Sequence, residues 1–394
     1  MFKKRILVVL LILLTTVFYT CQEPFSYDET LAGKDIMSLP PMKDQFAEYF
    51  DIGNIMNPGD TAANGTSITN GRLTRHFNVL TAENNMKPNS MVSNTDPNSY
   101  NFSTADRMVD SALASGIKVV GHTLLWHSQI PQWQRNLAAA SKETALAAMK
   151  KYVTDVVTHF KGRVYAWDVL NEAFPDGNAG SNWRTAMRTG QQGNPWFMSI
   201  GADFVYEGFL AARLADPDAV LYYNDYNTNQ IGRATLIRNM VRDVNNQYKN
   251  TFPDAEHSRN GARNLIEGIG MQEHHNTDVQ AGEVRNTINL FRQIGVILSV
   301  SELDVLAMGW STFSSGGGSG AYRTPYAGGN LSAQARSYSN FFRVYLDNAD
   351  IIERVTFWGV TDNQSWRSGG QPLLFDGNGR SKPAYAAVIG SLTD

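Results

Sequence analysis

Strand-like and helix-like segments alternate along most of this chain, and this alternation limits the fold more than any other feature. Eight segments rich in β-branched and aromatic residues end in polar residues, and they span 50–57, 77–84, 118–127, 164–173, 219–227, 265–275, 295–305 and 354–366. Amphipathic helical stretches lie between and after them, among them 141–162, 281–295, 331–350 and 382–392. Eight such units close a barrel, so we predict an α/β fold, a (β/α)8 TIM barrel in one domain.

A doubly wound open sheet is the competing fold for such a pattern. No GxGxxG motif follows the first strand, and polar residues crowd the ends of nearly all the strands, which favours the single functional face of a barrel. The Gly/Ser-rich stretch 314–320 resembles a linker, but one helix, one strand and a closing helix follow it. We therefore interpret this stretch as an insertion after the seventh strand.

The N-terminus has the layout of a signal peptide. Three basic residues, Lys3, Lys4 and Arg5, precede the apolar run 6–19, which is shorter than the about 20 residues of a spanning helix. Cys21, the only cysteine, follows this run and resembles the lipidated cysteine of bacterial lipoproteins.

These features divide the chain into a signal peptide at 1–20, a short tether at 21–40 and the barrel at 41–394. We expect secretion across a bacterial inner membrane and a lipid anchor at Cys21 in the envelope, at the outer membrane or cell surface. The alternative is that Cys21 belongs to a discarded leader, which leaves a periplasmic or extracellular protein.

The charge balance gives no reason to expect a polyanionic partner. The formal net charge is -3, and 11% of the residues are aromatic. We predict a neutral partner, no nucleic acid, no membrane contact except through Cys21, and a monomer.

Two carboxylates stand at the ends of predicted strands. Glu172 lies next to the end of the fourth strand segment, and Glu302 lies near the end of the seventh. Hydrolysis of the acetal between two sugars needs two such groups, one to protonate the departing oxygen and one to activate water or attack the anomeric carbon. The pair predicts a glycosidase, although either Glu viewed singly also fits a solvated strand end.

Two pairs of polar residues, each spaced two positions apart, predict a hydrogen-bond network beside the two glutamates. Gln272 and His274 share one face of a strand, as do Glu302 and Asp304. A histidine between two carboxylates orients the nucleophile and holds its charge. Asn171, by contrast, reaches the same site as its neighbour Glu172 only if the strand end bends or bulges.

Zinc is the alternative use of the histidines His122, His127, His274 and His275. No HxxxH or Cys/His spacing supports a closed metal site, so we predict no metal. Aromatic residues at strand ends, which pack on sugar rings in clefts, form the last group: Trp126, Tyr223, Tyr226, Trp358 and Trp366.

Six blocks in a fixed order resemble strands three to eight of glycoside hydrolase family 10, the endo-1,4-β-xylanases. They are GHTLLWHSQIPQW, WDVLNEA, LYYNDYN, EGIGMQEHH, LSVSELDV and FWGVTDNQSW. The resemblance implies endo-acting hydrolysis of β-1,4 bonds in xylan and xylo-oligosaccharides with retention of configuration, without a cofactor. It also implies that Glu172 is the general acid/base and that Glu302 is the nucleophile of a covalent glycosyl-enzyme intermediate.

The same resemblance implies the substrate contacts. The glycone side holds Glu83, Asn84, Lys87, His122, Trp126 and Gln129. Asn171, Gln272 and His274 surround the cleaved residue, with Asp304 in support. Trp358 and Trp366 form an aromatic roof, and Tyr223 and Asn224 are product-side contacts.

Pro88 departs from the family pattern, because many members carry Trp there. Two alternatives to a xylanase stay open: a retaining barrel glycosidase that acts on another β-glycan, and a surface glycan-binding protein without catalysis.

Overall fold

The computed structural model describes residues 27–177, 180–252, 264–315 and 329–393. The predicted signal peptide, Cys21 and residues 316–320 of the Gly/Ser-rich stretch lie outside these ranges. The described residues that flank this stretch belong to α11 (Trp310–Ser315) and α13 (Leu331–Leu346), which follow the seventh barrel strand.

Eight parallel strands close into a barrel, which confirms the predicted fold. The order is β6-β5-β4-β3-β2-β1-β9-β8, and pairing of β6 with β8 closes the ring. The strands of the barrel are β1 (Asp51–Met56), β2 (Val79–Ala82), β3 (Lys118–Leu125), β4 (Ala166–Asn171), β5 (Val220–Asp225), β6 (Gly268–Met271), β8 (Ile297–Val305) and β9 (Ile352–Phe357). The short β7 (His274–His275) pairs with the end of β8.

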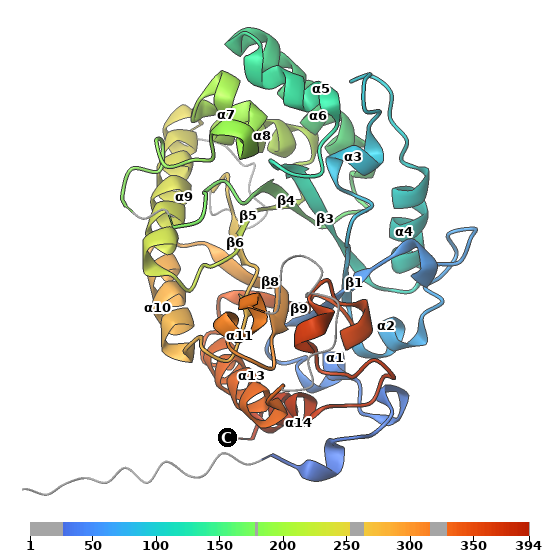
Figure 1. Cartoon of the computed structure of the whole chain (residues 1–394). Coiled ribbons are helices and arrows are strands. Elements are labelled where there is room, and N and C mark those ends of the chain that lie inside the picture. The colour runs from blue at the N-terminus through green and yellow to red at the C-terminus, as the bar shows by residue number, and fades with distance from the viewer. Residues whose placement is uncertain (1–26, 178–179, 253–263, 316–328, 394) are drawn as a thin grey trace, which may run out of the picture.

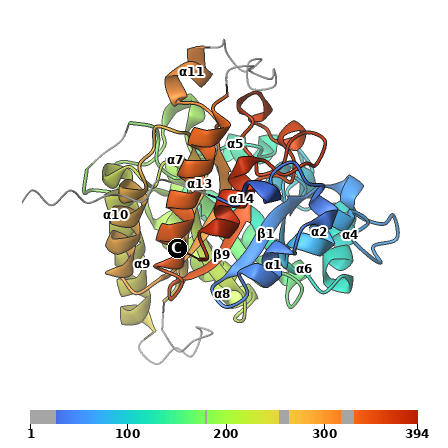
Figure 2. The same ribbon diagram turned by 90° about the horizontal axis from the view of Figure 1, so that it is seen from below.

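Helices surround the barrel, and the short α11 projects beyond the end of α13 (Figures 1 and 2). Besides α11 and α13 they are α1 (Met42–Gln45), α2 (Gly71–His76), α3 (Pro88–Met91), α4 (Ser103–Ala114), α5 (Gln132–Asn136), α6 (Lys142–Phe160), α7 (Pro195–Ile200), α8 (Asp203–Ala215), α9 (Ile231–Thr251), α10 (Ala281–Arg292) and α14 (Pro383–Gly390). The Ser141 side chain caps α6 by accepting a hydrogen bond from the backbone N–H of Thr144. Within the described ranges, none of these helices is long and apolar enough to cross a membrane.

The lower end of the barrel interior is filled by side chains from several strands. Val79, Val120, Ala166, Val220 and Tyr222 form one buried cluster there. The guanidinium of Arg354, also fully buried, lies 4.4 Å from the centre of the Tyr222 ring. Packing therefore closes the barrel below, so an open site is left at the carboxyl ends of the strands.

The expected tether at 21–40 needs correction where the structure describes it. Ile36 and Leu39 are buried, and the backbone N–H of Ile36 donates to the carbonyl of Gly379. The hydroxyl of Ser381 donates to the carbonyl of Leu31. Because these contacts bury apolar side chains and satisfy backbone groups, this segment is part of the folded body and not a free linker.

Gly121 of β3 offers a test of the barrel packing. A Cβ atom added there would lie 2.2 Å from the ring of Trp167, which is fully buried in β4. We predict that Gly121→Ala lowers the free energy of unfolding by about 1–3 kcal/mol, as overpacking does. Denaturant unfolding followed by circular dichroism measures this change.

Gly282→Ala is the matched control, since nothing lies within 4 Å of a Cβ added at this position in α10. Helix propensity makes it neutral or stabilising by up to about 1 kcal/mol. Equal stability of the two variants would contradict the packing described for β3 and β4.

Candidate active site

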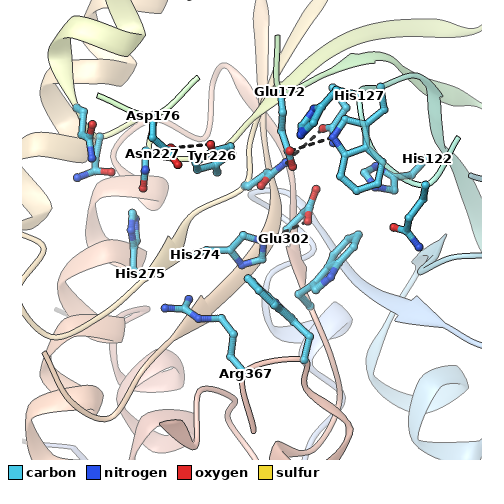
Figure 3. A pocket seen from close by; sticks show the side chains of 18 of the residues that line it. His122, His127, Glu172, Asp176, Tyr226, Asn227, His274, His275, Glu302 and Arg367 are labelled. Carbon is cyan, nitrogen blue, oxygen red and sulfur yellow. Dashed lines mark hydrogen bonds and ion pairs between the residues drawn. The ribbon is translucent and has the colours of Figure 1, made fainter. Parts of the chain in front are cut away.

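One cleft of about 1060 Å³ opens at the carboxyl ends of the barrel strands. Figure 3 shows Glu172 and Glu302 facing its interior. The cleft is lined by sixteen of the residues that the sequence analysis singled out: Glu83, Asn84, Lys87, His122, Trp126, His127, Gln129, Asn171, Glu172, Tyr226, Gln272, His274, His275, Glu302, Trp358 and Trp366.

His274 bridges the two carboxylates of β8. Its Nε2 lies 3.2 Å from Oε2 of Glu302, and its Nδ1 lies 3.0 Å from Oδ2 of Asp304. Glu302 and Asp304 are two residues apart on one strand, so alternation places both on the inner face, as predicted. Asp304 also accepts a hydrogen bond from the guanidinium of Arg367, to which it is ion-paired.

This network sets the charge of Glu302. Burial alone would raise its pKa, but the hydrogen bond from His274, the nearby His122 and the amide of Asn224 outweigh burial and hold the pKa below its usual value. Burial would likewise lower the pKa of His274, yet Asp304 and Glu302 raise it to about 9. At neutral pH, Glu302 is therefore an ionised carboxylate beside a cationic imidazole.

Glu172 has a different environment. Its Oε2 accepts a hydrogen bond from Nε1 of Trp126 at 2.9 Å, and its Oε1 accepts one from Nε2 of Gln272 at 3.0 Å. The backbone of Glu172 is left-handed, with φ of 54°. This turn follows β4, and it aims the side chain across the cleft.

An amide chain connects the two glutamates. Asn224 Nδ2 donates to Oε1 of Glu302 at 2.8 Å and to Oδ1 of Asn171 at 2.9 Å. Gln272 Nε2 donates to the same Asn171 oxygen at 3.2 Å, besides its bond to Glu172. Asn171 and Glu172 thus face one site despite being neighbours, because the backbone turns at Glu172 and the β4–β5 register shifts near Asp168.

The loops after β2 and β3 hold a second polar group. Lys87 Nζ donates to Oδ1 of Asn84 at 2.9 Å, and Gln129 Nε2 donates to the same oxygen at 3.2 Å. The Lys87 ammonium lies 5.1 Å from the centre of the Trp126 ring. Burial is the largest effect on Lys87 and leaves its pKa below the usual value, although the carboxylates of Glu302, Glu83 and Glu172 act to raise it.

Two tryptophans cover the His274 side of the cleft. The ring centre of Trp366 is 5.2 Å from that of His274, and the ring centre of Trp358 is 6.4 Å away. Trp358 is 6% exposed and Trp366 is 47% exposed, so the two rings form one buried and one open apolar wall. Pro88, which departs from the family pattern, is the first residue of α3 and is buried.

The expected direct contact by Tyr223 is wrong. Tyr223 is 0% exposed, and its hydroxyl donates to Asp225 and accepts from the backbone N–H of Ala173. Its ring packs near Phe174 at 6.3 Å, on the side of β5 that faces away from the cleft. Asn224 is also fully buried and contacts Glu302, but it does not line the cleft.

Three of the four histidines considered for an alternative zinc site have separate partners. His122 contacts Asp168, His274 contacts Glu302 and Asp304, and His275 contacts Glu273. Within the part of the chain that the structure describes, no group of three or more His, Cys, Asp or Glu side chains is arranged to hold a metal ion.

The cleft also contains residues that the sequence analysis did not assign to the site. They lie outside the barrel strands, on loops and at helix ends, and include Asp176, Arg188, Asn227, Asn229, Gln230, Asn276, Trp310 and Arg367. Arg367 had one available signal, since it directly follows Trp366, and the structure shows it paired with the buried Asp304. The others follow no periodic pattern.

Comparison with known proteins agrees with this geometry. The model of the family described as Glycosyl hydrolase family 10 matches residues 41–391. The chain is 34% identical to endo-1,4-beta-xylanase A of Thermotoga maritima over 89% of its own length, but it spans only 31% of that relative. It is 32% identical to the beta-1,4-xylanase of Dictyoglomus thermophilum, with 98% of this chain and 97% of that protein covered.

A solved structure of a family 10 xylanase is also similar to this chain. The bacterial Ig-like domain containing GH10 xylanase from termite gut has a TM-score of 0.85 and 53% sequence identity, with 92% of this chain and 80% of that chain covered. Since the family model covers nearly all of the described barrel, the chain belongs to glycosyl hydrolase family 10.

Proposed function

We propose that this protein is an endo-acting β-1,4-xylanase that hydrolyses xylan with retention of configuration. The observation that carries the proposal is the contrast between two glutamates in one cleft. Glu302 is held ionised by His274 and Asn224, whereas Glu172 lies between the N–H groups of Trp126 and Gln272. Acetal cleavage by double displacement needs two carboxyl groups in such different roles.

In the first step, Glu302 attacks the anomeric carbon while Glu172 gives its proton to the departing glycosidic oxygen. The bond between the anomeric carbon and that oxygen breaks, and a glycosyl ester forms on Glu302. In the second step, Glu172 takes a proton from water, the water oxygen attacks the anomeric carbon, and the ester bond to Glu302 breaks. Two inversions give net retention.

Xylan as the substrate is supported by the names of the relatives and by the aromatic and polar groups that line the cleft. A barrel glycosidase for another β-glycan would hydrolyse soluble cellulose or mannan instead. A pure binding protein would hydrolyse none of these polymers. Product analysis on linear xylan, soluble cellulose and mannan separates the three functions.

We predict that Glu302→Ala lowers kcat/KM on xylan by several orders of magnitude, because no other group replaces a covalent nucleophile. Release of reducing ends measures the loss. Glu143→Ala is a matched control, since Glu143 is an exposed carboxylate in the first turn of α6 and should leave activity unchanged. Substantial residual activity in Glu302→Ala with unchanged folding would remove Glu302 from this role.

Glu172→Ala should behave differently with different leaving groups. An aryl xylobioside with a good leaving group needs no proton, so we predict a burst of released phenol followed by slow turnover. Xylan, whose leaving oxygen must be protonated, should be cleaved very slowly. Stopped-flow absorbance measures the burst, and equal losses of glycosylation rate for both substrates would exclude Glu172 as the acid.

We also propose that the protein is secreted and anchored to a bacterial envelope by a lipid on Cys21, which lies outside the described residues. The support is the basic and apolar run that precedes this cysteine. We predict that the wild type incorporates a fatty-acid analogue and fractionates with membranes, whereas Cys21→Ser does neither. Unlabelled, soluble wild-type protein would overturn the anchor.

A further inference from the structure

An exposed tryptophan stands on the rim of the cleft, and the proposed catalytic steps do not use it. Trp310 lines the cleft and is 48% exposed. It is the first residue of α11, which projects beyond the end of α13 in the side view of Figure 2. Large exposed apolar side chains at a polar cleft are typical of binding surfaces.

The position of Trp310 is fixed by the barrel. Its backbone N–H donates to Oδ2 of Asp278 at 2.8 Å. The preceding Gly309 packs so closely that a Cβ atom there would lie 2.5 Å from Oδ1 of Asp278. Upstream, the backbone N–H of Leu306 donates to the carbonyl of His275 at 3.1 Å. The backbone at Trp310 is therefore held at a defined place relative to β7 and β8, and the indole extends from it to the rim of the cleft.

The neighbouring loops supply the polar half of a sugar site. The loop after β5 lines the cleft with Asn229 and Gln230, and the loop after β7 lines it with Asn276. Amide groups donate and accept hydrogen bonds with sugar hydroxyls, while an aromatic face packs against the C–H groups of a pyranose ring. Together they have the composition of a carbohydrate subsite.

The strand order places this group across the mouth from the expected glycone contacts. Glu83, Lys87 and Gln129 come from the loops after β2 and β3, whereas Trp310 follows β8 and its neighbours follow β5 and β7. In the close view of Figure 3, Asp176, Asn227 and His275 lie on one side of the two glutamates and His122 lies on the other. Trp310 thus belongs to the side from which the leaving chain departs.

We propose that Trp310 is the platform of a distal subsite that stacks a xylose ring of the leaving part of the chain. This inference rests on the proposed xylanase function and adds a residue that sets preference for longer substrates. A substrate too short to reach the platform gains nothing from it.

The test compares a long and a short substrate on the same variants. Trp310→Ala should lower kcat/KM for xylohexaose by roughly 3- to 10-fold, the scale of one aromatic packing contact. Hydrolysis of an aryl xylobioside, which has no leaving sugar, should be unchanged. Trp310→Tyr, which keeps an aromatic face, should retain most of the wild-type ratio. Leu214→Ala, at an exposed apolar position on α8, is the matched control.

Binding to the inactive Glu302→Ala protein gives a second readout. Calorimetry should show weaker xylohexaose binding, by a similar factor, when Trp310→Ala is added to this background. An unchanged ratio and unchanged binding would overturn the platform, as would an equal loss on the short substrate. If the wild type cleaves neither substrate, the proposed function itself fails, and this result is distinct from either outcome.

Discussion

The site depends on the imidazole of His274 between two buried carboxylates. Glu302 and Asp304 would be costly to bury as anions, but His274 contacts both, and Arg367 pairs with Asp304. The two carboxylates, the imidazolium of His274 and the guanidinium of Arg367 thus give this cluster a formal net charge of zero. Because the cluster is hydrogen-bonded as well as neutral, the buried carboxylate of Glu302 stays ionised without a solvent shell, as its proposed role of nucleophile requires.

Three residues that follow barrel strands near the site have an unusual, left-handed backbone conformation. Gln129, Glu172 and Glu273 are all left-handed, with φ of 46°, 54° and 57°. Such conformations cost about 1–3 kcal/mol each and persist only where the surroundings fix them. Glu273 shows how this is done: its buried carboxylate accepts hydrogen bonds from Thr228 at 2.9 Å and from Tyr345 at 3.2 Å. The turn it holds separates Gln272, which contacts Glu172, from His274.

Much of this arrangement was predictable because it follows periodicity. Hydrophobic runs predicted the strands, and alternation placed Glu302 and Asp304 together on the inner face of β8. The same rule does not apply where the chain leaves the strand, so the joint presentation of Asn171 and Glu172 required a bend that only the structure locates. Tyr223 was predicted to contact the substrate because it stands among polar residues at a strand end. Its side chain faces outward, whereas that of the next residue, Asn224, faces Glu302. Arg367 lies on a loop and Trp310 begins the short helix α11, and at both places tertiary contacts and not local periodicity set the direction of the side chain.

The central claim is that Glu302 forms a covalent bond to the sugar, and trapping this intermediate tests it most directly. In a 2-deoxy-2-fluoro xylobioside the fluorine slows both steps, because both transition states resemble an oxocarbenium ion. A good leaving group speeds only the first step, so the glycosyl-enzyme accumulates. We expect mass spectrometry of the intact protein to show one added disaccharide, and peptide mapping to locate it on Glu302. An adduct on another residue, or no adduct together with inversion of the anomeric configuration, would contradict the mechanism.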